Sequence, residues 1–393
     1  MPVNNRIAAS AGEIAGWRQA LHRRPELQYD LPLTAAYVAE KLRAFGCDEV
    51  VEGIGGTGVV GVIRGRGPGG AIALRADMDA LPIVEATGAA YSSEHAGRMH
   101  ACGHDGHMAM LLGAARHLAE TRAFAGTVHV VFQPAEEGGA GARAMVEDGL
   151  FTRFPSDAVY GMHNMPGLEV GRFAMRPGPI MASSDQVEII VEGRGGHAAK
   201  PEQGVDAVLC AAAIVTSLQQ VVARNITPLD AAVISICVFQ AGEVDNVLPP
   251  RARLLGTVRA LDPQVRLKVF KRVEEVAQGI AAAHGASATV RFKEGYPVTR
   301  NHAREAAFAA EVAREVAGDD HVDDATSPMM WAEDFAYMLE ALPGAYVFVG
   351  NGPSSGLHSP TYDFCDDAIA FGASYWVRLA ERALGEGRRD AAA

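Results

Sequence analysis

The feature of this sequence that most constrains its fold is a series of short apolar runs, each followed by polar side chains. Runs with the length and composition of buried strands span residues 71–76, 127–132, 157–161 and 345–350. Segments with the apolar spacing of helices separate them. Strands that alternate with helices indicate an α/β domain built on a largely parallel sheet.

The polar side chains after these runs are of types that bind metals or move protons. In chain order they are Asp77 and Asp79, Glu136 and Glu137, His163, and His358. In an open α/β sheet the carboxyl ends of the strands border the crevice that binds ligands, so we expect these side chains to face one crevice. Each of them alone has an ordinary explanation, such as a helix cap or a solvated surface. Together they favour a metal site.

Further candidate ligands lie in the stretch Met99–His107, which reads MHACGHDGH and leads directly into an apolar-periodic helix. Cys102 and His104 are separated by one residue and can point at one centre, and thiolate and imidazole both bind borderline-soft metals. The start of a helix also stabilises a thiolate. For a single C-x-H pair, a reduced cysteine beside surface histidines is the simpler explanation. The candidate ligands at the strand ends favour the metal site instead.

The run Gly53–Gly58 fits the G-x-G-x-x-G pattern of dinucleotide-binding loops. That pattern requires a helix directly after the glycines. Here residues 59–63 read VVGVI, which is typical of a strand. We therefore interpret the glycines as a turn between two strands rather than as a nucleotide site.

A chain of 393 residues exceeds the size of one ordinary domain. From residue 185 the pattern becomes strand, helix, two strands, helix and strand. These elements span residues 186–191, 206–222, 232–240, 251–259, 263–284 and 288–292. This is the ferredoxin-like order, complete in itself. We predict an inserted α+β domain over residues 185–293 and a first domain formed by residues 1–184 and 294–393.

Two more specific expectations concern the insert. We expect its first strand to lie at an edge of the sheet, where a second copy of the chain could pair with it. We expect the helix over residues 206–222 to turn its apolar side chains inward. These are Val208, Ala211, Val215 and Leu218.

Charge and cysteine content restrict the partners and the compartment. A net charge of −12 at pH 7 argues against nucleic acid or an anionic membrane as a partner. The N-terminus lacks the pattern of a secretory signal, and no apolar stretch of transmembrane length is evident. The five cysteines are odd in number and far apart, which does not fit a disulfide framework. We therefore expect a cytoplasmic enzyme.

Several motifs, in order and at the right distances, carry a resemblance to a known family. They are LHRRPEL, DMDALP, MHACGHD, QPAEEGGAGA, GMH, GGHAAKP, NVLPP with GTVR, WAEDFAYM and LHSP. The chain resembles the di-metal amidohydrolases and metallopeptidases that include hippurate hydrolases, aminoacylases and plant auxin-conjugate hydrolases. The resemblance covers nearly the whole chain. It implies a zinc-peptidase-like architecture for the first domain and a dimerisation and lid role for the insert.

The resemblance also implies roles for the candidate residues. Cys102 would bridge two divalent ions as a thiolate, and the remaining ligands would be His104, Glu137, His163 and His358. Glu136 would be the general base for a metal-activated water, and Asp79 would orient the ligands from behind. A set of thiolate, imidazole and carboxylate ligands accepts manganese, zinc, cobalt or nickel. The family pattern gives no ligand role to His107.

In the insert, the resemblance makes His197 a donor to the scissile carbonyl oxygen, in its own subunit or across a dimer interface. Asn246 and Arg259 suit a carboxylate. The implied substrate is therefore an N-acyl amino acid of the hippurate, acetyl or aromatic acyl type. The implied assembly is a homodimer or a dimer of dimers.

Alternative functions stay open at this point. A dipeptidase or carboxypeptidase-like peptidase could use the same two-metal site. A hydrolase with Cys102 as nucleophile and His104 as base is disfavoured, because one intervening residue gives this pair poor geometry and no third orienting group is evident. A metal-binding protein without catalysis is disfavoured because such a site has no use for Glu136.

Overall fold

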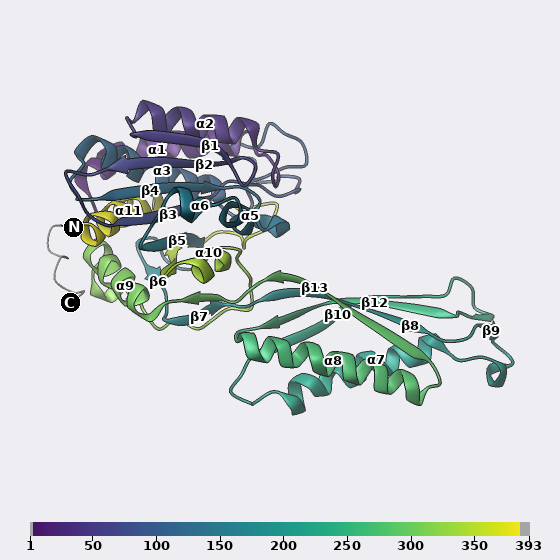
Figure 1. The fold of residues 1–393 in the computed structure, drawn as a ribbon. Helices are drawn as coiled ribbons and strands as arrows, with labels where there is room; N and C mark the ends of the chain where they lie inside the picture. Colours follow the sequence, from purple (N-terminus) through teal and green to yellow (C-terminus); the bar gives the residue numbers. More distant parts are fainter. Residues whose placement is uncertain (1–2, 386–393) are drawn as a thin grey trace. The chain divides into compact units, whose positions relative to one another are not determined.

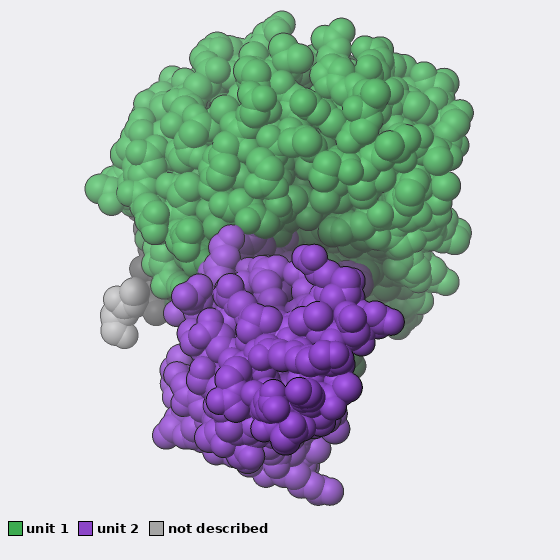
Figure 2. Space-filling view, turned by 90° about the vertical axis from the view of Figure 1, so that its right-hand side faces the viewer, with its two compact units in different colours: residues 1–180, 300–327, 334–393 green, residues 181–299, 328–333 purple. Residues whose placement is uncertain are grey.

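The computed structural model describes residues 3–385, which divide into two compact units, coloured separately in Figure 2. Unit 1 consists of Met1–Ile180, Arg300–Ser327 and Asp334–Ala393. Unit 2 consists of Met181–Thr299 and Pro328–Glu333. Unit 2 therefore contains the predicted insert, residues 185–293, and in addition residues 181–184, 294–299 and 328–333. Strands β7 (Gly178–Met181) and β14 (Thr299–Asn301) lie where the chain passes between the units.

Unit 1 is built on an eight-stranded sheet (Figure 1) with the order β1-β2-β4-β3-β5-β16-β6-β15. The strands are β1 Glu49–Ile54, β2 Gly58–Arg64, β3 Ala71–Asp77, β4 Thr127–Gln133, β5 Ala158–Met165, β6 Phe173–Ala174, β15 Val322–Asp323 and β16 Gly344–Gly350. The neighbouring strands β4, β3, β5 and β16 run parallel to one another. They correspond to the four predicted strands. The predicted fold class, α/β with a largely parallel sheet and an α+β insert, is confirmed.

Helices cover this sheet and complete the core of unit 1. The longer ones are α1 Asn5–His22, α2 Pro32–Ala44, α3 His104–Thr121, α9 Ala303–Ala317 and α11 Ala368–Ala383. Shorter ones are α4 Glu136–Gly139, α5 Gly141–Glu147, α6 Leu150–Arg153, α10 Ala336–Ala341 and the 3-10 turn Asp319–His321. Helix α3 is buried almost throughout and packs against α1 and α11, because nearly every position in its sequence is apolar or small. The core therefore encloses the helix that begins at His104.

The glycine run at Gly53–Gly58 forms the turn between β1 and β2, which pair antiparallel with Ile54 opposite Gly58. Gly53, Gly55 and Gly56 all have positive φ angles, which glycine adopts at little cost. A strand follows the run and no helix does, so the prediction of a turn is confirmed.

Unit 2 has the predicted β-α-β-β-α-β order. Its main elements are β8 Ser184–Glu192, α7 Ala207–Gln220, β10 Ala232–Ala241, β12 Arg251–Ala260, α8 Pro263–Ala283 and β13 Ser287–Tyr296. Between β8 and α7 lie the short strand β9 (Gly196–His197) and the 3-10 turn Pro201–Gln203, and the short strand β11 (Val247–Leu248) precedes β12. The four long strands form an antiparallel sheet in the order β10-β12-β8-β13. Helices α7 and α8 cover one face of it (Figure 1).

The expectation that the first strand of the insert lies at an edge is wrong. Strand β8 is internal, between β12 and β13, and the edges are β10 and β13. Each β-α-β connection passes over the neighbouring strand position, so the first strand of this topology receives a partner on both sides. Any pairing of sheets between two copies would therefore use β10 or β13.

Helix α7 also differs from expectation. Ala211 and Leu218 are buried as predicted, but Val208 is 38% exposed and Val215 is only partly buried. Together with the π-helical turn Val221–Asn225, the segment Ala207–Asn225 is long and apolar enough by length and composition to cross a membrane, with a mean hydropathy of 1.5. The expectation that no apolar stretch reaches transmembrane length is therefore wrong for this segment, in which Arg224 is the one charged residue. Its inner side packs in the core of unit 2, which accounts for part of its apolar character.

Candidate metal centre

The candidate ligands of unit 1 come from the ends of neighbouring strands and from the start of α3. Asp77 ends β3, and Gln133 ends β4 three positions before Glu136. His163 lies near the end of β5, and His358 follows β16 in a loop. Since β4, β3, β5 and β16 are parallel neighbours, these ends meet at one edge of the sheet. The structure thus brings together the side chains that follow the predicted strands.

The predicted ligand atoms gather into overlapping groups. One group is Cys102, His104 and His163, and another is Cys102, Glu137 and His358. Within each group the ligand atoms all lie within 4.8 Å of one another. Cys102 is shared by both groups, with its Sγ 3.4 Å from His163 Nε2. The other four predicted ligands therefore all lie around the thiol of Cys102.

Hydrogen bonds orient two of the imidazoles so that their free nitrogens face this cluster. His104 Nδ1 lies 2.7 Å from the carbonyl oxygen of Asp79, and His163 Nδ1 lies 2.7 Å from the carbonyl oxygen of Asn164. A carbonyl oxygen can only accept a hydrogen bond, so each Nδ1 is the donor, and Nε2 is the nitrogen left to bind a metal ion. His104 Nε2 is buried and has no hydrogen-bond partner among the residues described. A buried, unpaired Nε2 beside a thiol and a carboxylate fits a divalent ion of the zinc or manganese kind.

The electrostatics of the cluster favour a bound cation. Burial raises the pKa of the Cys102 thiol well above its usual range, and the nearby carboxylates of Glu137 and Glu136 raise it further. Burial alone would lower the pKa of His104, but Asp77 and Asp79 raise it to about 10. The protein by itself therefore keeps the thiol neutral and attracts positive charge. A metal ion would supply that charge and permit the thiolate.

Glu136 and Glu137 lie in a tight turn, residues 135–141, which we call the base turn. Asp79 holds it: one carboxylate oxygen accepts a hydrogen bond from the backbone N–H of Glu136 at 2.9 Å and the other from that of Glu137 at 3.1 Å. The Asp79 carboxylate is completely enclosed, and burial raises its pKa. Glu137 in turn lies 3.2 Å from His358 Nε2. The base turn is thus tied to both the β3 end and the His358 loop.

His107 supports the cluster rather than joining it. Its Nδ1 is 2.6 Å from Asp77, and its Nε2 is 2.7 Å from Asn164 Oδ1 and 3.1 Å from the backbone nitrogen of Asn164. Both ring nitrogens are engaged, although His107, His104 and Asp77 are close enough to hold an ion between them. Asp77 also pairs with the buried Arg75 at 2.8 Å. These contacts fix the floor of the site.

Residues that the sequence analysis missed lie around the cluster. Arg75 carried a visible signal, since it is a basic residue within an otherwise apolar run of strand length, residues 71–76. Asn164 and Tyr362, which share a 2.6 Å hydrogen bond, carried none. Their roles depend on which strands become neighbours.

In unit 2, His197 and Asn246 come together. His197 lies in β9 opposite Val247 of β11, and the N–H of Ala198 donates to the carbonyl of Asn246 at 3.0 Å. Both side chains are exposed. The two candidates therefore occupy one surface at the end of the sheet where β9 lies (Figure 1).

Arg259 lies near the other end of the same sheet. Its guanidinium donates to the carbonyl of Met330 at 3.2 Å, and burial lowers its pKa. Strand β12 runs from Arg251, which pairs with Glu192, to Arg259, so the two ends are about 26 Å apart at roughly 3.3 Å per residue. His197 lies beyond Glu192 in the chain. Arg259 and His197 of one subunit are therefore too far apart to touch one small substrate.

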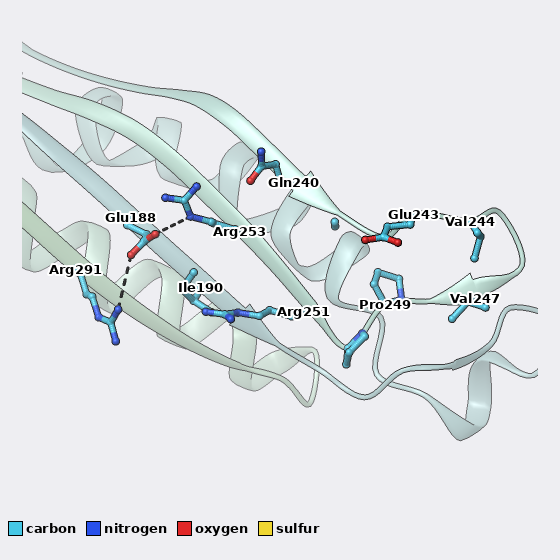
Figure 3. A pocket seen from close by; sticks show the side chains of 13 residues that line it. Glu188, Ile190, Gln240, Glu243, Val244, Val247, Pro249, Arg251, Arg253 and Arg291 are labelled. Atoms are coloured by element: carbon cyan, nitrogen blue, oxygen red, sulfur yellow. Dashed lines mark hydrogen bonds and ion pairs between the residues drawn. The ribbon is translucent and has the colours of Figure 1, made fainter.

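A cavity of about 740 Å³ in unit 2 contains none of the predicted site residues. Figure 3 shows that its arginines come from neighbouring strands. Arg253 donates to Glu188 at 2.7 Å, and Arg291 lies 3.9 Å from the same carboxylate. Glu188 therefore neutralises part of the positive charge of this cavity.

Comparison with known proteins gives consistent matches. The family model of "Peptidase family M20/M25/M40" matches residues 73–382. The hippurate hydrolase of Campylobacter jejuni is 43% identical over 373 residues, which cover 95% of this chain and 97% of that protein. The N-acetyl-L-cysteine deacetylase of Bacillus subtilis is 38% identical, with 98% of this chain and 90% of that protein covered.

Two further matches bear on the chemistry. Thermostable carboxypeptidase 2 of Saccharolobus solfataricus is 38% identical, with 97% of this chain and 98% of that protein covered. Among solved structures, a dinuclear metal-binding peptidase from Bacillus subtilis is 34% identical, with a TM-score of 0.85 and coverage of 96% of this chain and 99% of that one.

Proposed function

The chain belongs to peptidase family M20/M25/M40 and is a hydrolase of amide bonds, and from that premise we propose that it cleaves N-acyl amino acids at a two-metal centre. The observation that carries the proposal is the convergence of four ligand side chains on Cys102, with Glu136 beside them. The relatives named for hippurate and N-acetylcysteine support the N-acyl amino acid class.

We infer that two divalent ions bind here. The ligands would be Cys102, shared between the ions, with His104, Glu137, His163 and His358. These are too many for one tetrahedral ion, and the likeness to a dinuclear metal-binding peptidase supports the number. When bound, such ions polarise the scissile carbonyl and lower the pKa of the attacking water.

Glu136 would act as the general base. Its carboxylate lies close to the carboxylate of Glu137 and the imidazole of His104, with one ligand atom of each residue within 4.8 Å of the other two. Amide hydrolysis needs one group that takes the proton from water and returns it to the leaving nitrogen. Glu136 would make this exchange, and the hydrogen bond from its backbone N–H to Asp79 supports the proposal. Its neighbour Glu137 is the metal ligand, so the two carboxylates have different roles.

The substrate carboxylate would bind to groups of unit 2, and we propose that two subunits contribute them. Arg259 and Asn246 suit a carboxylate, and His197 would donate to the scissile carbonyl oxygen. Because Arg259 and His197 of one subunit lie at opposite ends of the sheet, one site would use Arg259 from one chain and His197 with Asn246 from a second. This favours a homodimer, or a dimer of dimers, with His197 acting in trans.

A peptidase acting on short peptides is the second candidate, and the likeness to a carboxypeptidase favours it. The cysteine-nucleophile alternative fits less well. His104 uses Nδ1 on the Asp79 carbonyl, and burial holds the pKa of the Cys102 thiol high. A cysteine nucleophile needs a lowered pKa. The cytoplasm stays our proposed location, since the cysteines of the described residues are all unpaired.

The proposal is tested with purified protein stripped of metal and reconstituted separately with manganese, zinc, cobalt and nickel. N-acetyl, N-benzoyl and N-indoleacetyl amino acids would be compared with dipeptides and N-blocked dipeptides. We expect hydrolysis of at least one N-acyl series with release of the free amino acid, and loss of activity in a chelator. Faster cleavage of peptides would favour the second candidate, and full activity in metal-free protein would contradict both.

A further inference from the structure

A segment near the N-terminus, Gln28–Tyr29, lies against the base turn. The backbone carbonyl of Gln28 accepts a hydrogen bond from the N–H of Ala135 at 3.1 Å. The side-chain amide of Gln28 donates to the carbonyl of Glu137. The hydroxyl of Tyr29 donates to the carbonyl of Gly139 at 2.7 Å. Three hydrogen bonds therefore hold the base turn at alternate residues on either side of Glu136.

The base turn needs such support because its backbone is strained. Ala135 and Ala140 have φ angles of 53° and 57°, in the left-handed region that disfavours residues with a Cβ. Left-handed alanines persist only where the surrounding structure enforces them. The contact is also close, since a Cβ at Gly139 would overlap the side-chain oxygen of Gln28.

The segment itself is anchored. The carbonyl of Glu26 accepts a hydrogen bond from the N–H of Ala80 at 2.8 Å, directly after Asp79 in the chain. The hydroxyl of Thr57 donates to the carbonyl of Tyr29 at 3.1 Å. Gln28 has a φ of 55°, a further left-handed residue that its neighbours keep in place. Gln28 and Tyr29 are therefore themselves held in place and can restrain the backbone of the base turn.

We propose that Gln28 and Tyr29 are positioning residues that hold the carboxylate of Glu136 in its productive place. The proposal rests on the proposed function in taking Glu136 as the general base. Neither side chain needs to touch the substrate. Each acts through the backbone of the base turn, which carries the base and the ligand Glu137.

Two variants remove single contacts with little other change. Tyr29→Phe deletes the hydroxyl that donates to the carbonyl of Gly139. Tyr29 is 38% exposed, so the fold should tolerate this substitution. Gln28→Asn keeps an amide and tolerates the left-handed backbone, but it is one methylene too short to reach Glu137. The matched control is Tyr37→Phe, which deletes a tyrosine hydroxyl on α2 of the same unit.

For each variant we expect kcat to fall by about tenfold, the effect of one lost hydrogen bond, with KM within about twofold and metal content unchanged. Tyr37→Phe should retain the parental kcat. In a Glu136→Gln background, Tyr29→Phe should change the residual rate by less than about twofold, because the base that it positions is gone. A further tenfold loss of the residual rate in the Glu136→Gln background, or a change in KM without a change in kcat, would overturn the proposal.

Hydrogen–deuterium exchange separates this proposal from the proposed function, since it needs no substrate. In both variants the amides of residues 135–141 should exchange about tenfold faster than in the parent, while those of α3 stay unchanged. Unchanged exchange in the base turn would refute the positioning role. Faster exchange in a protein that cleaves no N-acyl amino acid would instead refute the proposed function and leave the structural contact established.

Discussion

Replacing Asp79 by asparagine tests whether this carboxylate controls the position of the base. Both of its oxygens accept backbone hydrogen bonds, from Glu136 at 2.9 Å and from Glu137 at 3.1 Å. Asparagine has the same shape but offers one acceptor oxygen and one NH2 group. In Asp79→Asn, one of the two backbone N–H groups would therefore face a donor.

The magnitude follows from these contacts. A hydrogen bond to a charged acceptor is worth about 1.5–3 kcal/mol, and an unsatisfied buried donor costs about 1–3 kcal/mol. The change therefore weakens the hold on the base turn by roughly 2.5–6 kcal/mol. The left-handed alanines Ala135 and Ala140 strain that turn by about 1–2 kcal/mol each. Since the loss is similar to the strain, the turn should shift and displace both Glu136 and Glu137.

We expect kcat/KM to fall by about 10²–10³-fold and metal affinity to weaken by about 10–100-fold. The assay combines steady-state hydrolysis of the best N-acyl amino acid with competition titration against a chelator. Glu26→Gln is the matched control, because the Glu26 carboxylate also uses both oxygens on consecutive backbone N–H groups, those of Leu33 and Thr34, at the start of α2. It should lose stability but keep most activity and metal affinity. The reasoning is refuted if Asp79→Asn loses no more activity or metal affinity than Glu26→Gln.

Three further predictions address the base, the subunits and the pH dependence. Glu136→Gln should keep the fold and both ions but lower kcat by about 10³-fold or more; turnover within a few-fold of the parent would exclude Glu136 as the base. Mixing His197→Ala with Glu136→Gln subunits should restore activity in the mixed dimers if His197 acts in trans; no recovery despite proven exchange of subunits would exclude trans action. Burial alone would lower the pKa of His22, but Asp105 and Glu85 raise it to about 9. A raised histidine pKa stabilises the fold fully below the unfolded value of about 6.5, and that stabilisation is lost as the pH rises through about 9. The parent should therefore lose roughly 2–3 kcal/mol more than His22→Gln between pH 6.5 and 9.5 in denaturant unfolding, and equal losses would contradict this linkage.

Much of the catalytic unit could be predicted because its signals are local. Apolar runs of strand length followed by polar residues determine which segments become strands and which side chains lie at their ends. Parallel strands have their carboxyl ends at the same edge of the sheet. Glu137, His163 and His358 are therefore expected at one edge, independently of how the helices pack on the sheet. The pair Cys102 and His104 is close in sequence and needs only the start of α3 to orient it.

Features that depend on which segments become neighbours in space could not be predicted from local sequence patterns. The contacts that join His107 to Asp77 and Asn164 form because β3 and β5 both adjoin α3, and the spacing of three residues from His104 does not specify them. The internal place of β8 follows from the path of the helix connections, which a pattern of strands and helices leaves undetermined. Val208 is exposed because fewer positions of α7 face the core of unit 2 than the number of apolar residues in the helix suggests.

The separation of Arg259 from His197 has the same origin. Both belong to the insert, and in the sequence they are equally plausible partners for one substrate. Strand register places them at opposite ends of an antiparallel sheet, because the chain reverses direction between them. Likewise, Gln28 and Tyr29 lie more than a hundred residues before the base turn in the chain, and only the tertiary structure brings them into contact with it. The sequence by itself determined the chemical groups and the strands that carry them. The tertiary structure decided which groups share a site, because contacts between distant segments depend on sheet order and register rather than on local pattern.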